Sequence, residues 1–188
     1  MGKLVVTEFV TVDGVFEDPG GAESFEHGGW SFQFDRGAEG DQFKLDELVA
    51  ADAQLLGRVT YDGFAQAWPK MRDDQFGEKM NTMPKYVVSN TLESADWENS
   101  TVIGGDAPMD EIAGLKQQID GDILVAGSGQ LVRSLTDAGL VDEFHLMVFP
   151  VVLGSGRRLF DGVDTAPKLR LQSTQPAGEA LILTYVPR

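Results

Sequence analysis

Two glycine-containing segments carry the residue types and spacing of a phosphate-binding site. In one of them, the apolar run at 123–126 is followed by Gly127-Ser128-Gly129 and then by apolar residues at helical spacing. A strand that turns on glycine straight into a helix leaves the first N–H groups of the helix unsatisfied, and these groups and the helix dipole favour an anion. Because glycine has no side chain, the anion can approach the backbone closely. This segment predicts a phosphate-binding turn; a plain strand-to-helix turn is the alternative.

The second segment repeats this order and adds a cation and a hydroxyl. A short apolar run ends at Leu56 and is followed by Gly57-Arg58-Val59-Thr60. The planar guanidinium of Arg58 can hold a phosphate with two hydrogen bonds, and Thr60 can donate from the first turn of the following helix. The alternative is that Arg58 is a solvated charge and Thr60 a local helix cap.

A standard dinucleotide-binding Rossmann domain is disfavoured. Its fingerprint requires a third glycine at position 132 and an acidic residue about 20 residues beyond the turn. Position 132 is Val132, and the place of the acidic residue is taken by Met147, inside an apolar run.

The composition is that of a globular protein and excludes several kinds of site. The net charge of −15 and the pI near 4.3 leave no basic stripe for a nucleic acid. No cysteine is present, which excludes disulfides and thiol catalysis. His27 and His145 have no partner at metal-ligand spacing, so we predict no metal site. Without a signal-peptide core or an apolar run of ~18 residues, we expect a cytoplasmic protein and no membrane segment.

The two turns are predicted to belong to a sheet whose strands alternate with helices. Apolar and β-branched runs predict strands at 3–11, 53–56, 85–89, 100–103 and 123–126. The spacing of apolar residues predicts helices at 41–51, 57–67, 108–119 and 130–139, with a weakly helical segment at 70–83. This alternation is typical of a mostly parallel sheet with helices on both faces.

The C-terminal part of the chain follows a different pattern. Residues 144–153 read as one long apolar strand, and segments 169–173 and 180–186 predict a pair of antiparallel strands with no helix between them. We therefore expect a single α/β domain over residues 1–188, mostly parallel, with an antiparallel C-terminal ribbon. The long apolar strand also suits the interface of a homodimer.

A long loop precedes the first helix. Between residues 21 and 40 it combines several glycines with Phe25, Trp30, Phe32 and Phe34. Long ordered loops in compact domains are often functional, so we take Trp30 and Phe34 as candidate substrate contacts. The alternative is a surface loop held down by aromatic anchors.

Four segments together resemble one family. In their order and spacing they are similar to the dihydrofolate-reductase-like family, in the branch shared by the C-terminal reductase domain of riboflavin biosynthesis and by small stand-alone deaminase-reductase proteins. The resemblance covers nearly the whole chain and implies the dihydrofolate-reductase-like fold. The segments that carry it are 56–61, 85–92, 125–131 and 142–160.

The resemblance implies NADPH as the cofactor. The two glycine turns would hold its pyrophosphate from two sides, and residues 89–91 would lie at its adenine-ribose end. The family usually has a basic residue at or beside position 90, where this chain has Asn90, so NADH is the alternative unless Arg58 meets the 2′-phosphate. The implied cofactor-binding residues are Gly57, Arg58, Thr60, Ser89, Asn90, Thr91, Gly127, Ser128, Gly129, Gln130 and Leu131.

The resemblance also suggests residues on the substrate side. Asp13 matches the family's loop over the nicotinamide and would orient the substrate or relay a proton, or else simply form a turn. Gly154 and Arg157 belong to a segment that resembles the substrate side of the riboflavin branch, where Arg157 or Arg158 would bind a ribityl or phosphate group. The alternative is that the two arginines help tie a dimer or pair with the abundant carboxylates. On the first predicted helix, Asp46 and Glu47 are acidic, but their neighbours do not show either facing inward.

The sequence thus predicts an NAD(P)H-dependent oxidoreductase that transfers a hydride to a small pterin- or pyrimidine-like heterocycle. A nucleotide-binding protein of the same fold without reductase activity is the alternative, because no acid on the first helix stands out. A flavodoxin-like FMN binder is a third reading, and the antiparallel C-terminal ribbon argues against it.

Overall fold

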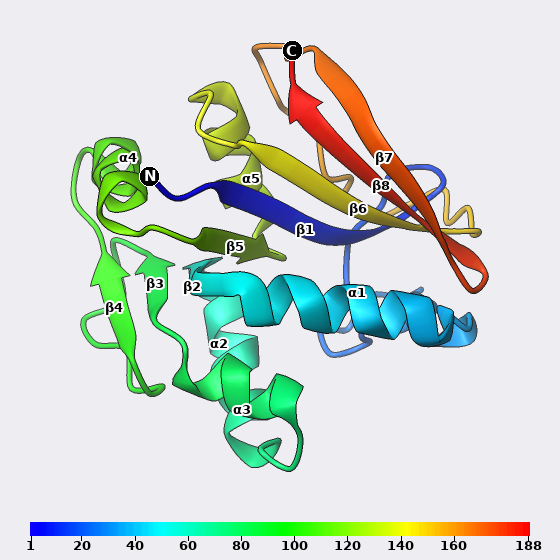
Figure 1. The fold of residues 1–188 in the computed structure, drawn as a ribbon, viewed down its shortest axis with the longest axis horizontal. Helices are drawn as coiled ribbons and strands as arrows, with labels where there is room; N and C mark the ends of the chain where they lie inside the picture. The colour runs from blue at the N-terminus through cyan, green and yellow to red at the C-terminus, as the bar shows by residue number, and fades with distance from the viewer.

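The computed structural model describes residues 1–188, and one eight-stranded sheet runs through it (Figure 1). The strands are β1 (Leu4–Thr11), β2 (Ala51–Gly57), β3 (Lys85–Val88), β4 (Ser100–Ile103), β5 (Asp122–Ala126), β6 (Glu143–Phe149), β7 (Leu169–Ala177) and β8 (Ala180–Pro187). They lie in the order β4-β3-β2-β5-β1-β6-β8-β7. Strands β1 to β6 pair in parallel, and β8 pairs antiparallel with both β6 and β7. The predicted fold class is confirmed.

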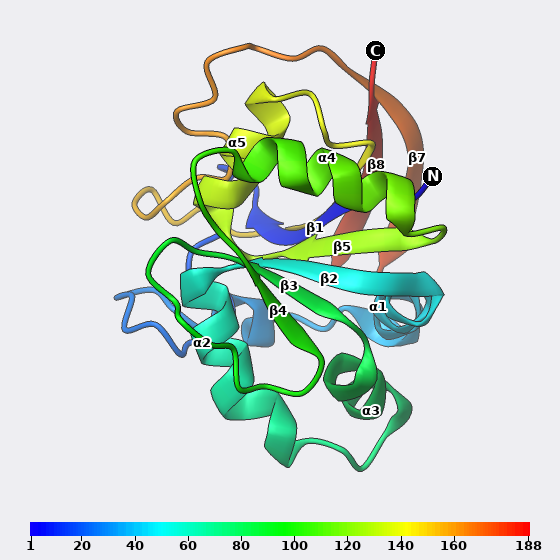
Figure 2. The ribbon, with the colours of Figure 1, turned by 90° about the vertical axis from the view of Figure 1, so that its left-hand side faces the viewer.

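Helices cover both faces of the sheet (Figure 2). Side chains of α4 and α5 pack into the core on one face, and those of α1, α2 and α3 pack on the other. Short 3-10 helices, Trp30–Gln33 and Trp68–Lys70, lie in the connections. The helices are α1 (Gly37–Ala50), α2 (Arg58–Ala67), α3 (Gln75–Thr82), α4 (Pro108–Gln118) and α5 (Gly129–Asp137).

Strand β1 is central and buried along nearly its whole length. Its alternate residues Leu4, Val6 and Val10 pack in the core with α4 and α5, whereas Val5 points to the opposite core. β-branched side chains fit such a doubly covered strand well.

The apolar stretch at 144–153 is not one strand. β6 ends at Phe149, because Pro150 follows and cannot donate to a strand ladder. β6 pairs with β1 on one side and with β8 on the other, so it has no free edge for a partner chain. Burial inside the sheet accounts for its apolar character.

The loop between β1 and α1 is held down by aromatic anchors. Trp30 is fully buried, its ring centroid lies 5.5 Å from that of Phe149, and its indole N–H donates to the carbonyl of Glu17 (2.9 Å). The ring of Phe34 packs on the same Phe149, with centroids 6.2 Å apart. Trp30 is therefore a core residue, and its indole is not available to a substrate, contrary to the expectation from the sequence.

Candidate functional site

The predicted phosphate-binding turns meet at one edge of the sheet. β2 lies between β3 and β5 and is parallel to both, so the carboxyl ends of the three strands point to the same edge. Residues 57–60, which we call the α2 turn, follow β2, and residues 127–131, the α5 turn, follow β5. Ser89 follows β3 beside them. Parallel α/β sheets bind ligands at this edge.

The two turns are hydrogen-bonded to each other. The Ser128 N–H donates to Thr60 Oγ1 (2.9 Å), and the Gly57 N–H donates to Ser128 Oγ (2.8 Å). Gly127 has φ of 59°, and a Cβ added there would lie 2.8 Å from Thr60 Oγ1. Both the left-handed backbone and the close approach therefore require glycine at this position.

Neither turn supplies a side-chain cap to the helix that it begins. The N-caps of α2 and α5 are Gly57 and Ser128, the residues that bond the two turns together. Two sets of first-turn N–H groups, each at the positive end of a helix dipole, thus lie side by side. This arrangement fits a pyrophosphate, which carries negative oxygens on two linked phosphates.

The residues at the start of α5 contribute in different ways. A Cβ on Gly129 would lie 2.1 Å from Phe16 Cζ, so only glycine lets the ring of Phe16 pack against the helix start. Leu131 is buried in the core beneath α5 and can offer a ligand only its backbone N–H, whereas Gln130 is exposed.

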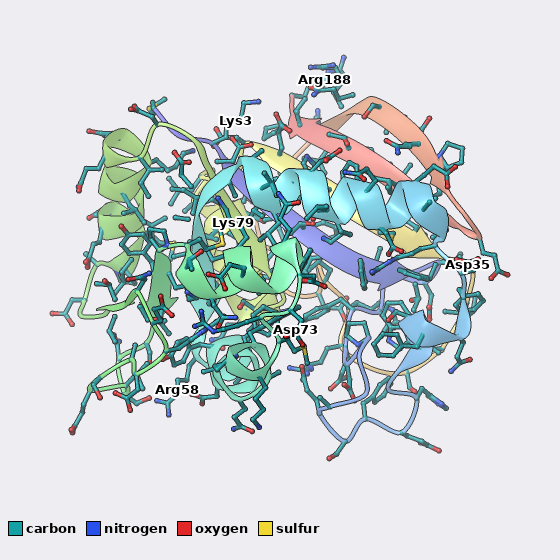
Figure 3. The ribbon with its side chains drawn as sticks, turned by 60° about the horizontal axis from the view of Figure 1, so that its bottom comes forward. Lys3, Asp35, Arg58, Asp73, Lys79 and Arg188 are labelled. Atoms are coloured by element: carbon teal, nitrogen blue, oxygen red, sulfur yellow. The ribbon has the colours of Figure 1, made fainter.

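Arg58 lies at the periphery of the molecule (Figure 3). Its Nε donates to both carboxylate oxygens of Asp62, one turn further along α2, at 2.9 and 2.8 Å. Arg58 and Leu92 also line one cavity of about 540 Å³ between α2 and the segment after β3. The guanidinium is thus on the β3 side of the site, but it forms an ion pair with the carboxylate of Asp62.

The polar residues after β3 form a self-bonded turn. Ser89 Oγ accepts from the N–H groups of Thr91 (3.2 Å) and Leu92 (3.1 Å). Asn90 Oδ1 accepts from the N–H of Gly105 and so connects this turn to the loop after β4. The structure brings Ser89, Asn90 and Thr91 to the same sheet edge as the two glycine turns.

Asp13 connects the end of β1 with the segment after β6. Its carboxylate accepts hydrogen bonds from the hydroxyl of Thr11 (2.6 Å) and from the N–H groups of Leu153 (3.3 Å) and Gly154 (2.9 Å). The Thr11 hydroxyl, followed by the two N–H groups, lowers the pKa of Asp13 to about 2. Asp13 is therefore ionised at neutral pH and unsuited to relaying a proton there.

Arg157 is matched by two carboxylates. Its Nε donates to Glu17 (2.8 Å), and its Nη2 donates to Glu23 (2.7 Å). These ion pairs fasten the segment after β6 onto the loop after β1, where Val15 and Arg158 also form a β-bridge. The guanidinium that the sequence suggested for binding a ribityl or phosphate group is therefore paired with Glu17 and Glu23 of the same chain.

The first helix does carry an inward-facing acid. The side chain of Glu47 is only 6 % exposed; it pairs with Lys44 and accepts from the hydroxyl of Thr7 (2.7 Å), and one of its oxygens lies 3.0 Å from His145 Nδ1. Burial opposes ionisation of Glu47, but Lys44, His145 and Thr7 outweigh it, so the pKa of Glu47 lies below its ordinary value. This acid is held in a network between α1 and the sheet.

Glu8 of β1 was missed by the sequence reading. The residue is 6 % exposed, and its Oε1 is buried without any hydrogen-bond partner. Burial raises the pKa of Glu8 well above its ordinary value, against the opposing effects of Lys44 and of the Gly127 N–H. A charged residue between Val6 and Val10, on the inward face of a buried strand, was the available signal.

No group of three or more histidine, aspartate or glutamate side chains is arranged to hold a metal ion. None of the helices combines the length and the apolar character needed to cross a bilayer.

Comparison with known proteins gives the chain its family. A family model described as "RibD C-terminal domain" matches residues 2–183. The chain belongs to the RibD C-terminal domain family. The Bacillus subtilis (strain 168) protein YwjB is 33 % identical to it over 184 residues, which cover 98 % of this chain and 97 % of that relative.

Solved structures agree with the fold of the chain. A putative riboflavin biosynthesis protein from Shewanella sp. PV-4 superposes with a TM-score of 0.77 at 19 % identity, covering 99 % of both chains. The dihydrofolate reductase of Enterococcus faecalis complexed with NADP(H) superposes with a TM-score of 0.56 at 13 % identity, covering 99 % of this chain and 96 % of that one. The predicted family resemblance is confirmed.

Proposed function

We propose that this protein is an NADPH-dependent reductase that transfers a hydride to a small pterin- or pyrimidine-like heterocycle. The observation that carries the proposal is the pair of helix N-termini at the α2 and α5 turns, bonded to each other through Thr60, Ser128 and Gly57. The family and its structural relatives support it, since one of those relatives is complexed with NADP(H).

The residues of the chain have binding and orienting roles in this proposal. The bound cofactor supplies the hydride. The first-turn N–H groups of α2 and α5 bind the pyrophosphate, and Thr60 adds its hydroxyl, whose proton is free because Oγ1 acts as acceptor for Ser128. Ser89, Asn90 and Thr91 face the adenosine end. Asp13 fixes the segment at 153–154 against the end of β1.

The choice between NADPH and NADH depends on Arg58 in this proposal. NADPH carries a 2′-phosphate that a guanidinium recognises well. The competing Asp62 carboxylate is half-exposed and lies on the same helix, so a 2′-phosphate with more charge can displace it. Substitution of Arg58 by alanine should then weaken NADPH more than NADH.

The role of the joined turns can be tested with a single methyl-for-hydroxyl exchange. Thr60→Val keeps the side-chain shape and removes a hydroxyl that bonds the α5 turn and, in the proposal, the pyrophosphate. A hydrogen bond to a charged group contributes about 1.5–3 kcal/mol, so the dissociation constant of NADPH should rise by about tenfold or more. Isothermal titration calorimetry or quenching of protein fluorescence would measure it.

A matched control separates this effect from a general loss of stability. Thr82→Val makes the same exchange on α3, where the hydroxyl is exposed and bonds only the Glu78 carbonyl. This variant should bind NADPH like the wild type.

The reductase proposal fails if the wild-type protein shows no thermal stabilisation by NADPH or NADH. Binding of NADPH without its oxidation by any pterin, pyrimidine or quinone would favour a nucleotide-binding protein without reductase activity.

A homodimer and a cytoplasmic location belong to the same proposal. With β6 inside the sheet, the support for a dimer comes from β7, which ends the strand order and leaves one edge unpaired. Residues 170–176 of β7 are all exposed, including Leu171 at 48 %. An unpaired edge strand is a ready surface for a second copy of the chain.

A further inference from the structure

Glu8 is the first residue of β1 beyond the segment that pairs with β5. β1 and β5 pair from Leu4↔Ile123 to Thr7↔Ala126, and then β5 turns away into the α5 turn. β1 continues alone beside β6, with Glu8 opposite Leu146. The side chain of Glu8 lies on the same face as Val6 and Val10, the face that α5 covers, and the Gly127 N–H acts on its carboxyl.

No cation is left to neutralise Glu8. The charged groups that act on its carboxyl are Lys44 and Glu47 of α1, which lies on the opposite face of the sheet. Lys44 is already paired with Glu47 and donates to Thr7 Oγ1 (2.7 Å), and Glu47 also contacts His145 of β6. With Oε1 lacking any partner, an ionised carboxylate at this place would be strongly unfavourable, so the neutral acid is the stable form.

We propose that Glu8 is a positioning residue of the cofactor site, which supports the α5 turn in its neutral, protonated form. The site binds an anion through helix N-termini whose effective charge is only about half a unit each. An ionised Glu8 beneath Gly127 would place a full negative charge against that anion and against the N–H groups that bind it. A neutral carboxyl leaves the helix dipoles unopposed. This inference rests on the proposed function for the identity of the anion.

The test compares the pH dependence of NADPH binding in three proteins. From roughly pH 5 to pH 9, the dissociation constant of the wild type should rise by up to about tenfold per pH unit once Glu8 begins to ionise. Glu8→Gln is isosteric and always neutral, so its dissociation constant should show no such rise. Glu111→Gln, an exposed acid on α4, is the matched control and should follow the wild type.

A second readout needs no cofactor. In the folded protein Glu8 keeps its proton at pH values where the unfolded chain, with an ordinary value of 4.5, has lost it. The folded state then binds more protons, so the free energy of unfolding falls as pH rises from about 4.5 towards the raised pKa. Glu8→Gln lacks this loss, and its stability relative to the wild type should increase with pH in urea unfolding.

The outcomes separate the inference from the proposed function. Absence of NADPH binding by the wild type at every pH would contradict the reductase, whereas the unfolding series would still report the neutral state of Glu8. NADPH binding with the same pH dependence in wild type and Glu8→Gln, over the pH values at which the unfolding series shows Glu8 losing its proton, would overturn the positioning role. If Glu8→Gln does not fold, a wild-type dissociation constant that stays constant while the stability of the wild type falls with the ionisation of Glu8 overturns it equally.

Discussion

At the scale of single residues, Asp13 joins the end of β1 to the segment after β6 through one carboxylate. The Thr11 hydroxyl and two backbone N–H groups bond it, and Arg158 Nη2 lies 3.6 Å away. These interactions all favour the charged form, which explains why the pKa of Asp13 falls to about 2. Asp13 therefore stabilises the loops near the site as an anion.

Replacement of Asp13 by asparagine should destabilise the protein at neutral pH, by about 1 kcal/mol after allowance for screening by solvent. Because the folded-state pKa is depressed, this contribution is present above the ordinary value of 3.8 and is lost as pH falls towards 2. Urea unfolding at several pH values would measure the difference between wild type and Asp13→Asn. The exposed Asp46 offers the control, and an equal loss in Asp46→Asn would contradict the assignment.

The sequence located well those turns that local backbone geometry marks. Gly57 and Gly127 were found because strand, glycine and helix follow one another along the chain. Glu8 was not found, and the orientation of Glu47 stayed undecided, because both depend on which face of a strand or helix is covered and by what. For Arg157 the structure shows the alternative of pairing with carboxylates. The sequence could not choose it over a substrate contact, because Glu17 and Glu23 approach Arg157 from a distant part of the chain.

At the scale of elements, a buried lysine holds α3, β3 and the segment before β4 together. Lys85 is fully buried, and its ammonium donates to the carbonyls of Asn81 (2.7 Å), Met83 (2.8 Å) and Glu98 (2.9 Å). It also lies 4.3 Å from the ring centroid of Trp97. Burial lowers the pKa of Lys85 to about 8, so most of the amine remains charged at neutral pH.

Lys85→Met should therefore cost about 2–4 kcal/mol of stability, because methionine fills the space but leaves three buried carbonyls without a donor. Thermal and urea unfolding would measure this loss. Lys70→Met, at an exposed position next to α3, should change stability by less than about 0.5 kcal/mol. An unchanged unfolding midpoint in Lys85→Met would show that the three hydrogen bonds do not stabilise the junction.

Elements whose signal is local were predicted closely, and those shaped by distant contacts were not. The strand-to-helix units β2–α2 and β5–α5 begin within two residues of their predicted positions, because glycine marks each junction. α1 begins four residues earlier than predicted, at Gly37, where its first turn packs against the hairpin of β7 and β8. Figure 3 shows Asp35 beside that hairpin, and its carbonyl accepts from the N–H of Glu179 (2.7 Å).

At the scale of the whole molecule, charge and the free sheet edge act against each other. Each chain carries a net charge of −15, so two chains that approach along β7 repel one another. The β7 edge nevertheless offers unpaired backbone groups and the exposed Leu171, which favour pairing at short range. Which effect prevails depends on the ionic strength, because salt screens the repulsion and leaves short-range contacts largely intact.

The proposed homodimer should therefore tighten as salt is added. Between about 0.02 M and 0.5 M NaCl, where the screening length shrinks from roughly 20 Å to about 4 Å, sedimentation equilibrium should show a falling dissociation constant. Leu171→Glu removes an apolar contact and adds a negative charge at the edge, so this variant should stay monomeric at salt concentrations that assemble the wild type. Val152→Glu, at a 67 % exposed position outside the strands, should assemble normally. A wild type that is monomeric at every salt concentration would contradict the dimer. Equal loss of dimer formation in Leu171→Glu and Val152→Glu would show that the interface does not lie at β7.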